Sequence, residues 1–332
     1  MKKTISTILA AAMICGALAL AGCGNTDTAS SSGAATDTTS STAASSESAA
    51  PASEAGSSAA GTASVDTTVS GKVTGSGSSA LLPLAQDAAS EYKKLNPNVS
   101  ITLSAGGSGQ GLKQVSDGSV DIGNSDVEAS TKLDKSKADE LVDHKVCIVT
   151  MAPIVNNDIG STVKSLTKDQ LTKIFTGETK NWKDVGGPDE EIVLVTRPTT
   201  SGTRALFKQY AMDGKEEVSG GSLETDDSGT LLQSIEQNKG AIGYIALSYL
   251  TGDNASKVTA LAIDGVQPTL ENTYNGTYPV WGYEHMYTKG EATGAAKAFI
   301  DFIQSEQYGQ KMESLGYGVT SKLSDKAVES HK

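Results

Sequence analysis

Residues 195–207 read Val195-Thr196-Arg197-Pro198-Thr199-Thr200-Ser201-Gly202-Thr203-Arg204-Ala205-Leu206-Phe207. The apolar run before Arg197 predicts a strand, and Pro198 prevents its simple continuation as a paired strand. Ser201 is a natural N-cap for the helix that we expect next. Backbone N–H groups at the helix start, close approach at Gly202 and the guanidinium fork of Arg197 are donors suited to an oxyanion. A serine cap of this kind also occurs where it only stabilises its own helix. The choice between a plain helix cap and an anion site therefore depends on the other loops.

The loops that follow other predicted strands carry similar groups. Short strands alternate with helices, which predicts α/β structure with a mainly parallel sheet, and ligands of such sheets bind beyond the carboxyl ends of the strands. Four loops end strands in this way, namely residues 77–80, 106–111, 124–126 and 197–203. They offer hydroxyls, glycines, backbone N–H groups, one arginine and one aspartate, and no cluster of metal ligands. This set of groups predicts a site for a tetrahedral oxyanion.

The amino-terminal end predicts export. Lys2 and Lys3 precede an apolar run, residues 5–20, that is short for a membrane span and typical of a signal peptide. The run closes with Leu20-Ala21-Gly22-Cys23, which resembles the lipobox of bacterial lipoproteins. That resemblance implies a signal peptide over residues 1–22 and lipidation of Cys23, and two acyl chains would hold the protein stably at a membrane.

Composition sets further limits. Residues 23–68 are nearly all Ser, Ala, Thr and Gly, which predicts a disordered tether. The formal net charge of -12 argues against a nucleic-acid partner. Of the three cysteines, Cys15 lies in the signal peptide and Cys23 carries the lipid, so Cys147 is left without a disulfide partner. The apolar neighbours of Cys147 predict a buried thiol.

Five motifs, taken together, resemble the PstS family, the phosphate-binding lipoproteins of bacterial phosphate ABC transporters. They are GSSALLPL at 77–84, GSGQGLKQV at 107–115, DIGNSD at 121–126, Arg197 with Ser201-Gly202-Thr203, and GAIGY at 240–244. The resemblance covers residues 73–315 and implies the type 2 periplasmic-binding-protein fold of the PBP-like superfamily. This is an α/β fold with two lobes, two hinge crossings and a ligand cleft between the lobes. Lobe I would comprise residues 69–151 and 278–332, and lobe II residues 152–277.

The resemblance also implies the binding residues. Carried over by position, the phosphate contacts are Ser79, Ala80, Ser108, Asp126, Arg197, Ser201, Gly202 and Thr203, with no cofactor and no metal. Similar proteins often have an aspartate two residues after the arginine, where this chain has Thr199, so the group that orients Arg197 is not evident. The implied partners are inorganic phosphate, the permease and ATPase of an ABC transporter, and the membrane through the lipid anchor. We expect a monomer on the extracytoplasmic face of the cell membrane, at the outer surface of a Gram-positive cell.

Asp126 distinguishes phosphate from other tetrahedral ions. A carboxylate beside an anion is repulsive unless the ligand brings a hydrogen for it to accept. Phosphate carries at least one hydrogen at neutral pH, whereas sulfate, molybdate and tungstate carry none, so a site built around that hydrogen rejects them. A receptor for one of those ions is the alternative among binding proteins, and Asp126 argues against it.

Two enzyme classes are weaker alternatives. The glycines of residues 75–80 match a dinucleotide fingerprint formally, but the acidic residue expected after the next strand is absent. A secreted hydrolase would need a general base, and His144, His285 and His331 all lie outside the four loops. We expect His144 and His285 to be strand residues. The sequence therefore predicts a binding protein and not an enzyme.

Overall fold

The computed structural model describes residues 65–220 and 223–331. The predicted signal peptide (1–22), the lipidated Cys23 and all of the predicted tether except residues 65–68 lie outside these ranges. The described end of the tether contacts the folded chain, since Asp66 O accepts a 2.5 Å hydrogen bond from Tyr92 and Val65 packs on the same apolar cluster. Within the described ranges, no helix combines the length and the apolar character that crossing a membrane requires.

Strands form the centre of the described structure. Their bounds are β1 Gly71–Gly77, β2 Val99–Ala105, β3 Ile122–Ser125, β4 Leu141–Val155, β5 Ser165–Leu166, β6 Val193–Thr196, β7 Leu223–Glu224, β8 Ala241–Ala246, β9 Thr259–Ala260, β10 Ala262–Ile263 and β11 Trp281–Lys289. A nine-stranded sheet has the order β2-β1-β3-β11-β4-β8-β6-β7, with β9 paired to β4, and β10 pairs with β5 separately. β1 is parallel to β2 and β3, and β6 is parallel to β7 and β8, whereas β11 and β4 are antiparallel.

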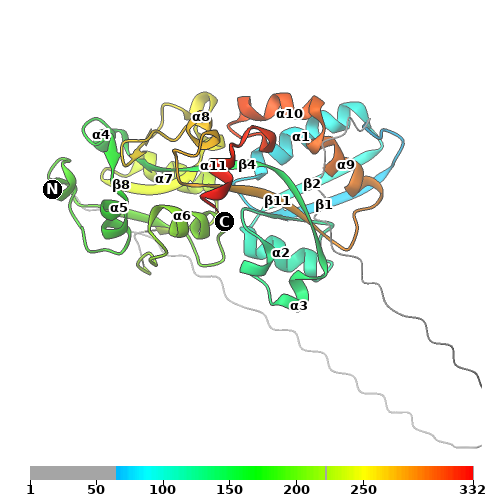
Figure 1. Ribbon diagram of the computed structural model, residues 1–332, viewed down its shortest axis with the longest axis horizontal. Helices are drawn as coiled ribbons and strands as arrows, with labels where there is room; N and C mark the ends of the chain where they lie inside the picture. The colour runs from blue at the N-terminus through cyan, green and yellow to red at the C-terminus, as the bar shows by residue number, and fades with distance from the viewer. Residues whose placement is uncertain (1–64, 221–222, 332) are drawn as a thin grey trace, which may run out of the picture. The chain divides into compact units, whose positions relative to one another are not determined.

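Helices connect the strands and flank the sheet (Figure 1). The α-helices are α1 Leu82–Leu95, α2 Ser108–Ser116, α3 Lys135–Ala138, α4 Asn157–Gly160, α5 Lys168–Phe175, α6 Gly202–Ala211, α7 Ser228–Gln237, α8 Leu270–Tyr274, α9 Gly294–Gln304, α10 Glu306–Met312 and α11 Asp325–Glu329. The 3-10 helices are η1 Ala129–Thr131, η2 Trp182–Val185, η3 Leu247–Leu250, η4 Gly252–Asn254, η5 Glu313–Leu315 and η6 Thr320–Lys322. Figure 1 shows α1, α9 and α10 on one side of β1 and β2, with α2 and α3 on the other. Strands alternate with helices along the chain, as predicted.

The first helix has the bounds that its sequence predicts. Pro83 stands in the first turn of α1, where a missing N–H costs nothing, and the helix ends at Leu95. Asn96 follows as the C-cap, and its side chain donates to Val69 O over 2.8 Å. The Asn96 side chain thereby ties the end of the helix to the residues before β1, and the first turn of the helix follows the loop that carries Ser79.

Two long strands run through the middle of the sheet. The last ten residues of β4 are buried, which explains its continuous apolar sequence. Its first part pairs with β11 as far as Thr150, and from Met151 onward it pairs with β8. The two predicted hinge crossings fall on β4 and just before β11, while the lobe boundaries at 151/152 and 277/278 stay a prediction.

Cys147 lies in the core as expected, together with large aromatic side chains. Trp182 and Tyr244 are completely buried in one large apolar cluster, and Cys147 is completely buried in another. His144 and His285 are strand residues of β4 and β11. The predictions for Cys147, His144 and His285 are confirmed.

Candidate anion-binding site

The four predicted loops lie at strand ends. β1 ends at Gly77, β2 at Ala105, β3 at Ser125 and β6 at Thr196. Three of the loops lead into α1, α2 and α6, as predicted. Ser201 is the N-cap of α6, because its hydroxyl accepts from the N–H of Arg204 over 3.3 Å. The N–H groups of Gly202 and Thr203 stand in the same first turn, where no intrahelical acceptor exists.

Asp126 accepts hydrogen bonds from hydroxyl groups of two loops that are remote in the sequence. Thr203 Oγ1 donates to Asp126 Oδ2 over 2.6 Å, and Ser108 Oγ donates to Asp126 Oδ1 over 3.3 Å. The Ser108 hydroxyl also accepts from the backbone N–H of Asp126 at 3.0 Å. All three side chains are buried. Each of the two carboxyl oxygens of Asp126 therefore accepts a hydrogen bond from a buried hydroxyl group.

Arg197 lies at the centre of a second group of polar contacts. Its side chain is completely buried. Nη2 donates to Ser228 Oγ at 3.0 Å and to Tyr244 O at 3.3 Å, while Nη1 donates to Asp226 O at 3.3 Å. Among the described residues, Arg197 Nε has no hydrogen-bond partner. A buried guanidinium with a free donor is a group on which an anion can bind.

Ser79 joins this second group. Its hydroxyl donates to Asp226 O over 2.7 Å and lies 2.9 Å from Ser228 Oγ. The carbonyl of the following residue, Ala80, accepts from Tyr317 Oη at 2.5 Å. The loop after β1 is therefore held against residues that lie 147 and 237 positions further along the chain.

Glycines allow the two groups to meet. A Cβ added at Gly202 would lie 2.2 Å from Ser108 Oγ and 3.0 Å from the Cβ of Asp126. A Cβ at Gly107 would lie 1.7 Å from Asp226 Oδ2, and the N–H of Gly109 donates to Thr200 O over 3.0 Å. Side chains at these positions would force the loops apart. With glycine there, the loops lie in contact, and all eight predicted contact residues are buried in this one region.

Asp226 is a residue of this region that the sequence did not indicate. Its Oδ1 lies 3.7 Å from Arg197 Nη1, so a carboxylate stands beside the guanidinium although residue 199 is a threonine. It follows the short strand β7, and nothing in the local sequence separates it from Asp227, which caps α7 by accepting from Thr230 N at 2.7 Å. Only the contact between segments 29 residues apart reveals it.

Lys132 is a second unpredicted residue. It follows η1, and its Nζ donates to Thr199 O at 2.8 Å and to Ser201 O at 3.1 Å. Burial lowers the pKa of the Lys132 ammonium, while the charges of Asp226 and Asp126 oppose that shift. Lys132 therefore adds a cation beside the site and fastens the loop that precedes α6.

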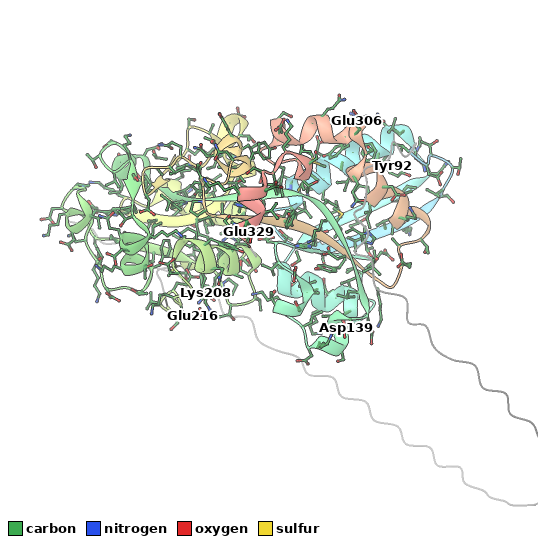
Figure 2. The ribbon with its side chains drawn as sticks, viewed as in Figure 1. Tyr92, Asp139, Lys208, Glu216, Glu306 and Glu329 are labelled. Atoms are coloured by element: carbon green, nitrogen blue, oxygen red, sulfur yellow. The ribbon has the colours of Figure 1, made fainter. Side chains whose placement is uncertain are left out.

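Arg204 is a buried structural residue. Its guanidinium donates from Nη1 to Arg197 O at 2.5 Å, and Nε lies 3.1 Å from Glu217 Oε1. Glu216 takes part as well, 3.2 Å from Nη2, and it also pairs with Lys208, as Figure 2 shows. Arg204 therefore stabilises the loop that precedes α6, because its buried partners are the backbone of Arg197 and the side chain of Glu217.

Burial dominates the electrostatics of the two buried acids near Arg197. It raises the pKa of Asp226, although Ser201 and Arg197 lower it. It raises the pKa of Glu217 as well, against the opposing charge of Arg204. Within residues 65–220 and 223–331, no three His, Cys, Asp or Glu side chains are grouped to hold a metal ion. The region offers donors and acceptors for an anion that carries hydrogen.

Comparison with known proteins gives the family. A family model described as a PBP superfamily domain matches residues 28–307. The phosphate-binding protein PstS of Bacillus subtilis is 53% identical over 245 residues, which are 74% of this chain and 79% of that relative. Among solved structures, a substrate-binding protein from Clostridium perfringens with bound phosphate is similar with a TM-score of 0.68 at 32% identity, covering 75% of this chain and 100% of its own.

A phosphate transport receptor from Vibrio cholerae is also similar, with a TM-score of 0.58 at 27% identity, covering 74% of this chain and 99% of its own. These matches and the mixed α/β sheet confirm the predicted type 2 periplasmic-binding-protein fold. The family match and the high identity to a curated relative lead to one conclusion. This chain belongs to the PBP superfamily and, within it, to the PstS family.

Proposed function

We propose that this protein binds inorganic phosphate outside the cytoplasm and delivers it to an ABC transporter for import. The observation that carries the proposal is the placement of Asp126, whose buried carboxylate accepts hydrogen bonds from Ser108 and Thr203. A site for any anion would need only donors. An acceptor built into such a site fits an anion that brings its own hydrogen, and phosphate does.

We assign the ligand contacts to the eight residues that the family resemblance implies. The hydroxyls of Ser79, Ser108, Ser201 and Thr203, the N–H groups of Ala80, Gly202 and Thr203, and the guanidinium of Arg197 would donate to phosphate oxygens. Asp126 would accept the phosphate hydrogen. Asp226 would orient Arg197 from the side.

The binding free energy shows how much each kind of contact must contribute. Micromolar affinity corresponds to about -8 kcal/mol, and one helix N-terminus in a partly buried place contributes up to about 2 kcal/mol. The starts of α1, α2 and α6 together would therefore fall short. Arg197 and the buried hydroxyls must provide the rest, and they do so best where water is excluded.

The experiment is a calorimetric titration of the purified chain with inorganic phosphate, run beside an assay for hydrolysis of a phosphate monoester. One-to-one phosphate binding without ester hydrolysis is the expected result. A chain that binds no phosphate would contradict the proposal. Hydrolysis of the ester would favour the hydrolase alternative, and equal binding of sulfate or molybdate would favour a receptor for another oxyanion.

We further propose that the chain acts as a monomer and is held at the membrane by lipid on Cys23. The support is the lipobox resemblance of Leu20-Ala21-Gly22-Cys23 and the Ser/Ala/Thr-rich composition after it. The test is membrane fractionation of cells that make the chain or its Cys23→Ser variant. Release of the variant into the medium is expected, and equal membrane retention of both would contradict lipid anchoring.

A further inference from the structure

Glu284 is a buried acid for which the site described above has no role. It lies in β11, its side chain is completely buried, and neither carboxyl oxygen has a hydrogen-bond partner within the described part of the chain. Keeping a carboxylate ionised in such a buried position costs several kcal/mol. The side chain of Glu284 must therefore be neutral, or have a function that explains the cost.

The strand register places Glu284 beside Asp126. β11 is antiparallel to β3, with Met286 opposite Asn124 and His285 opposite Ser125. The chain continues one residue beyond this last pair on each side, to Glu284 in β11 and to Asp126 just after the end of β3, so the two residues are neighbours, and the charge of Asp126 acts on Glu284. Two buried carboxyl groups therefore lie next to one another at the anion site.

We propose that Glu284 and Asp126 form a carboxyl pair that holds one proton, resident on Glu284, and that this pair limits phosphate binding to the pH range in which the proton stays bound. The inference rests on the proposed function. Two carboxylates that share a dry site cannot both be ionised without strong repulsion, so one of them keeps a proton.

The surroundings decide which acid holds the proton. Both carboxyl oxygens of Asp126 already accept hydrogen bonds, one from Ser108 and one from Thr203. Burial, and next the charge of Asp126, raise the pKa of Glu284 well above its usual range, and only the hydroxyl of Ser78 acts in the opposite direction. Glu284 is therefore the neutral partner.

The other titratable groups that face Glu284 do not offset this. They are Cys147 of β4, Tyr249 of η3 and Tyr317, which follows η5. Burial raises the pKa of each of these groups, so all three are neutral near pH 7. Asp126 is thus the charged neighbour that acts on Glu284.

The pair has a consequence for the ligand. With Glu284 neutral, an incoming phosphate meets one carboxylate, and that carboxylate accepts the phosphate hydrogen. When Glu284 loses its proton to solvent at high pH, the site gains a second negative charge that has no hydrogen to accept, and the affinity for an anion falls. Conversely, phosphate bound at high pH draws one proton from solvent back onto Glu284.

The experiment compares the full chain with its Glu284→Gln variant. Glutamine keeps the shape and neutrality of the protonated acid and cannot ionise. Phosphate affinity is measured by calorimetry from about pH 6 to about pH 9 for both proteins. Glu291→Gln is the matched control, since Glu291 is an exposed acid just after β11. The phosphate ion itself changes protonation over this range, but it does so equally for all three proteins.

We expect the affinity of the unaltered chain and of Glu291→Gln to fall between the two pH limits by about tenfold more than that of Glu284→Gln, as one added charge at close range requires. Parallel pH profiles of all three proteins would overturn the pair. A Glu284→Gln chain that fails to fold would overturn it too, because glutamine reproduces the form that the pair requires.

A second measurement needs no phosphate and so separates this inference from the proposed function. The folded-state pKa of Glu284 is raised above 4.5, its ordinary value, so its contribution to stability is full below that value and is lost as pH rises through the folded pKa. The Tm of Glu284→Gln should therefore rise relative to the unaltered chain as pH increases. A constant difference in Tm at every pH would contradict a titrating Glu284. Absence of phosphate binding with the predicted Tm trend would instead count against the proposed function alone.

Discussion

The hydroxyl of Thr203 donates to Asp126 Oδ2 over 2.6 Å, although 77 residues separate the two in the chain. Thr203 belongs to the first turn of α6, whereas Asp126 follows β3. The hydrogen bond therefore ties two loops together at the point where an anion would bind. It also fixes the carboxylate as an acceptor, which is the feature that we expect to select a ligand carrying hydrogen.

Substitution of Arg197 in the loop and of Arg204 in the helix is expected to have different effects. Arg197→Ala removes a buried donor with a free Nε, and loss of charge-assisted hydrogen bonds worth about 1.5–3 kcal/mol should weaken phosphate binding roughly 10- to 100-fold. Arg204→Ala leaves Glu217 buried without its cation, so it should lower the free energy of unfolding by about 3 kcal/mol and affect affinity less. Calorimetry and thermal unfolding of both variants separate the effects, and equal losses of affinity would show that the wrong arginine was assigned.

Gly202 should tolerate no side chain. An added Cβ would lie 2.2 Å from Ser108 Oγ and 2.8 Å from Ser108 Cβ, so Gly202→Ala should push the two loops apart and cost at least about tenfold in phosphate affinity. Gly309→Ala is the control, because its Cβ meets nothing within 4 Å inside α10. That variant should keep its affinity and gain about 0.5–1 kcal/mol of stability. Unchanged affinity in Gly202→Ala would refute the close approach of the loops.

The carboxyl-terminal segment is expected to be sensitive to acid. His331 stacks on both Tyr210 and Trp281 with centroid distances of 3.9 Å, and burial lowers its pKa from 6.5 to about 4. A base whose folded pKa is depressed contributes stability above its unfolded pKa and loses it as pH falls. Unfolding curves should show that His331→Gln flattens the decline in stability between these two pKa values. A decline of the same slope in both proteins would mean that His331 is not its source.

Local features of the fold were predictable from the sequence. Pro83 and Asn96 mark the ends of α1, and Ser201 marks the start of α6, because a cap or a proline acts within one turn. The ends of short strands located the four loops, since ligands gather at that edge of an α/β sheet. The contact residues followed from these loops and from the family resemblance, and their direct role in binding stays a prediction.

The residues that come to the site from remote segments of the chain could not be predicted from the sequence. Asp226, Lys132 and Glu284 reach the site through contacts between remote segments, and no spacing in the sequence marks them. Arg204 was open to two interpretations because its position in the first turn does not say which way it faces. Its partners Glu217 and Glu216 come from the loop after α6, and that loop buries it.

The central claim is that Asp126 accepts a hydrogen from the bound ion, and the phosphate-to-sulfate affinity ratio measures it directly. The unaltered chain should bind phosphate and reject sulfate. In Asp126→Asn, phosphate should bind about 10- to 100-fold more weakly, because a hydrogen bond to a charged acceptor is lost. Sulfate should bind better, since the amide can donate to a fully deprotonated ion. A narrowed ratio is the result that we predict, and a ratio that Asp126→Asn leaves unchanged would contradict the account.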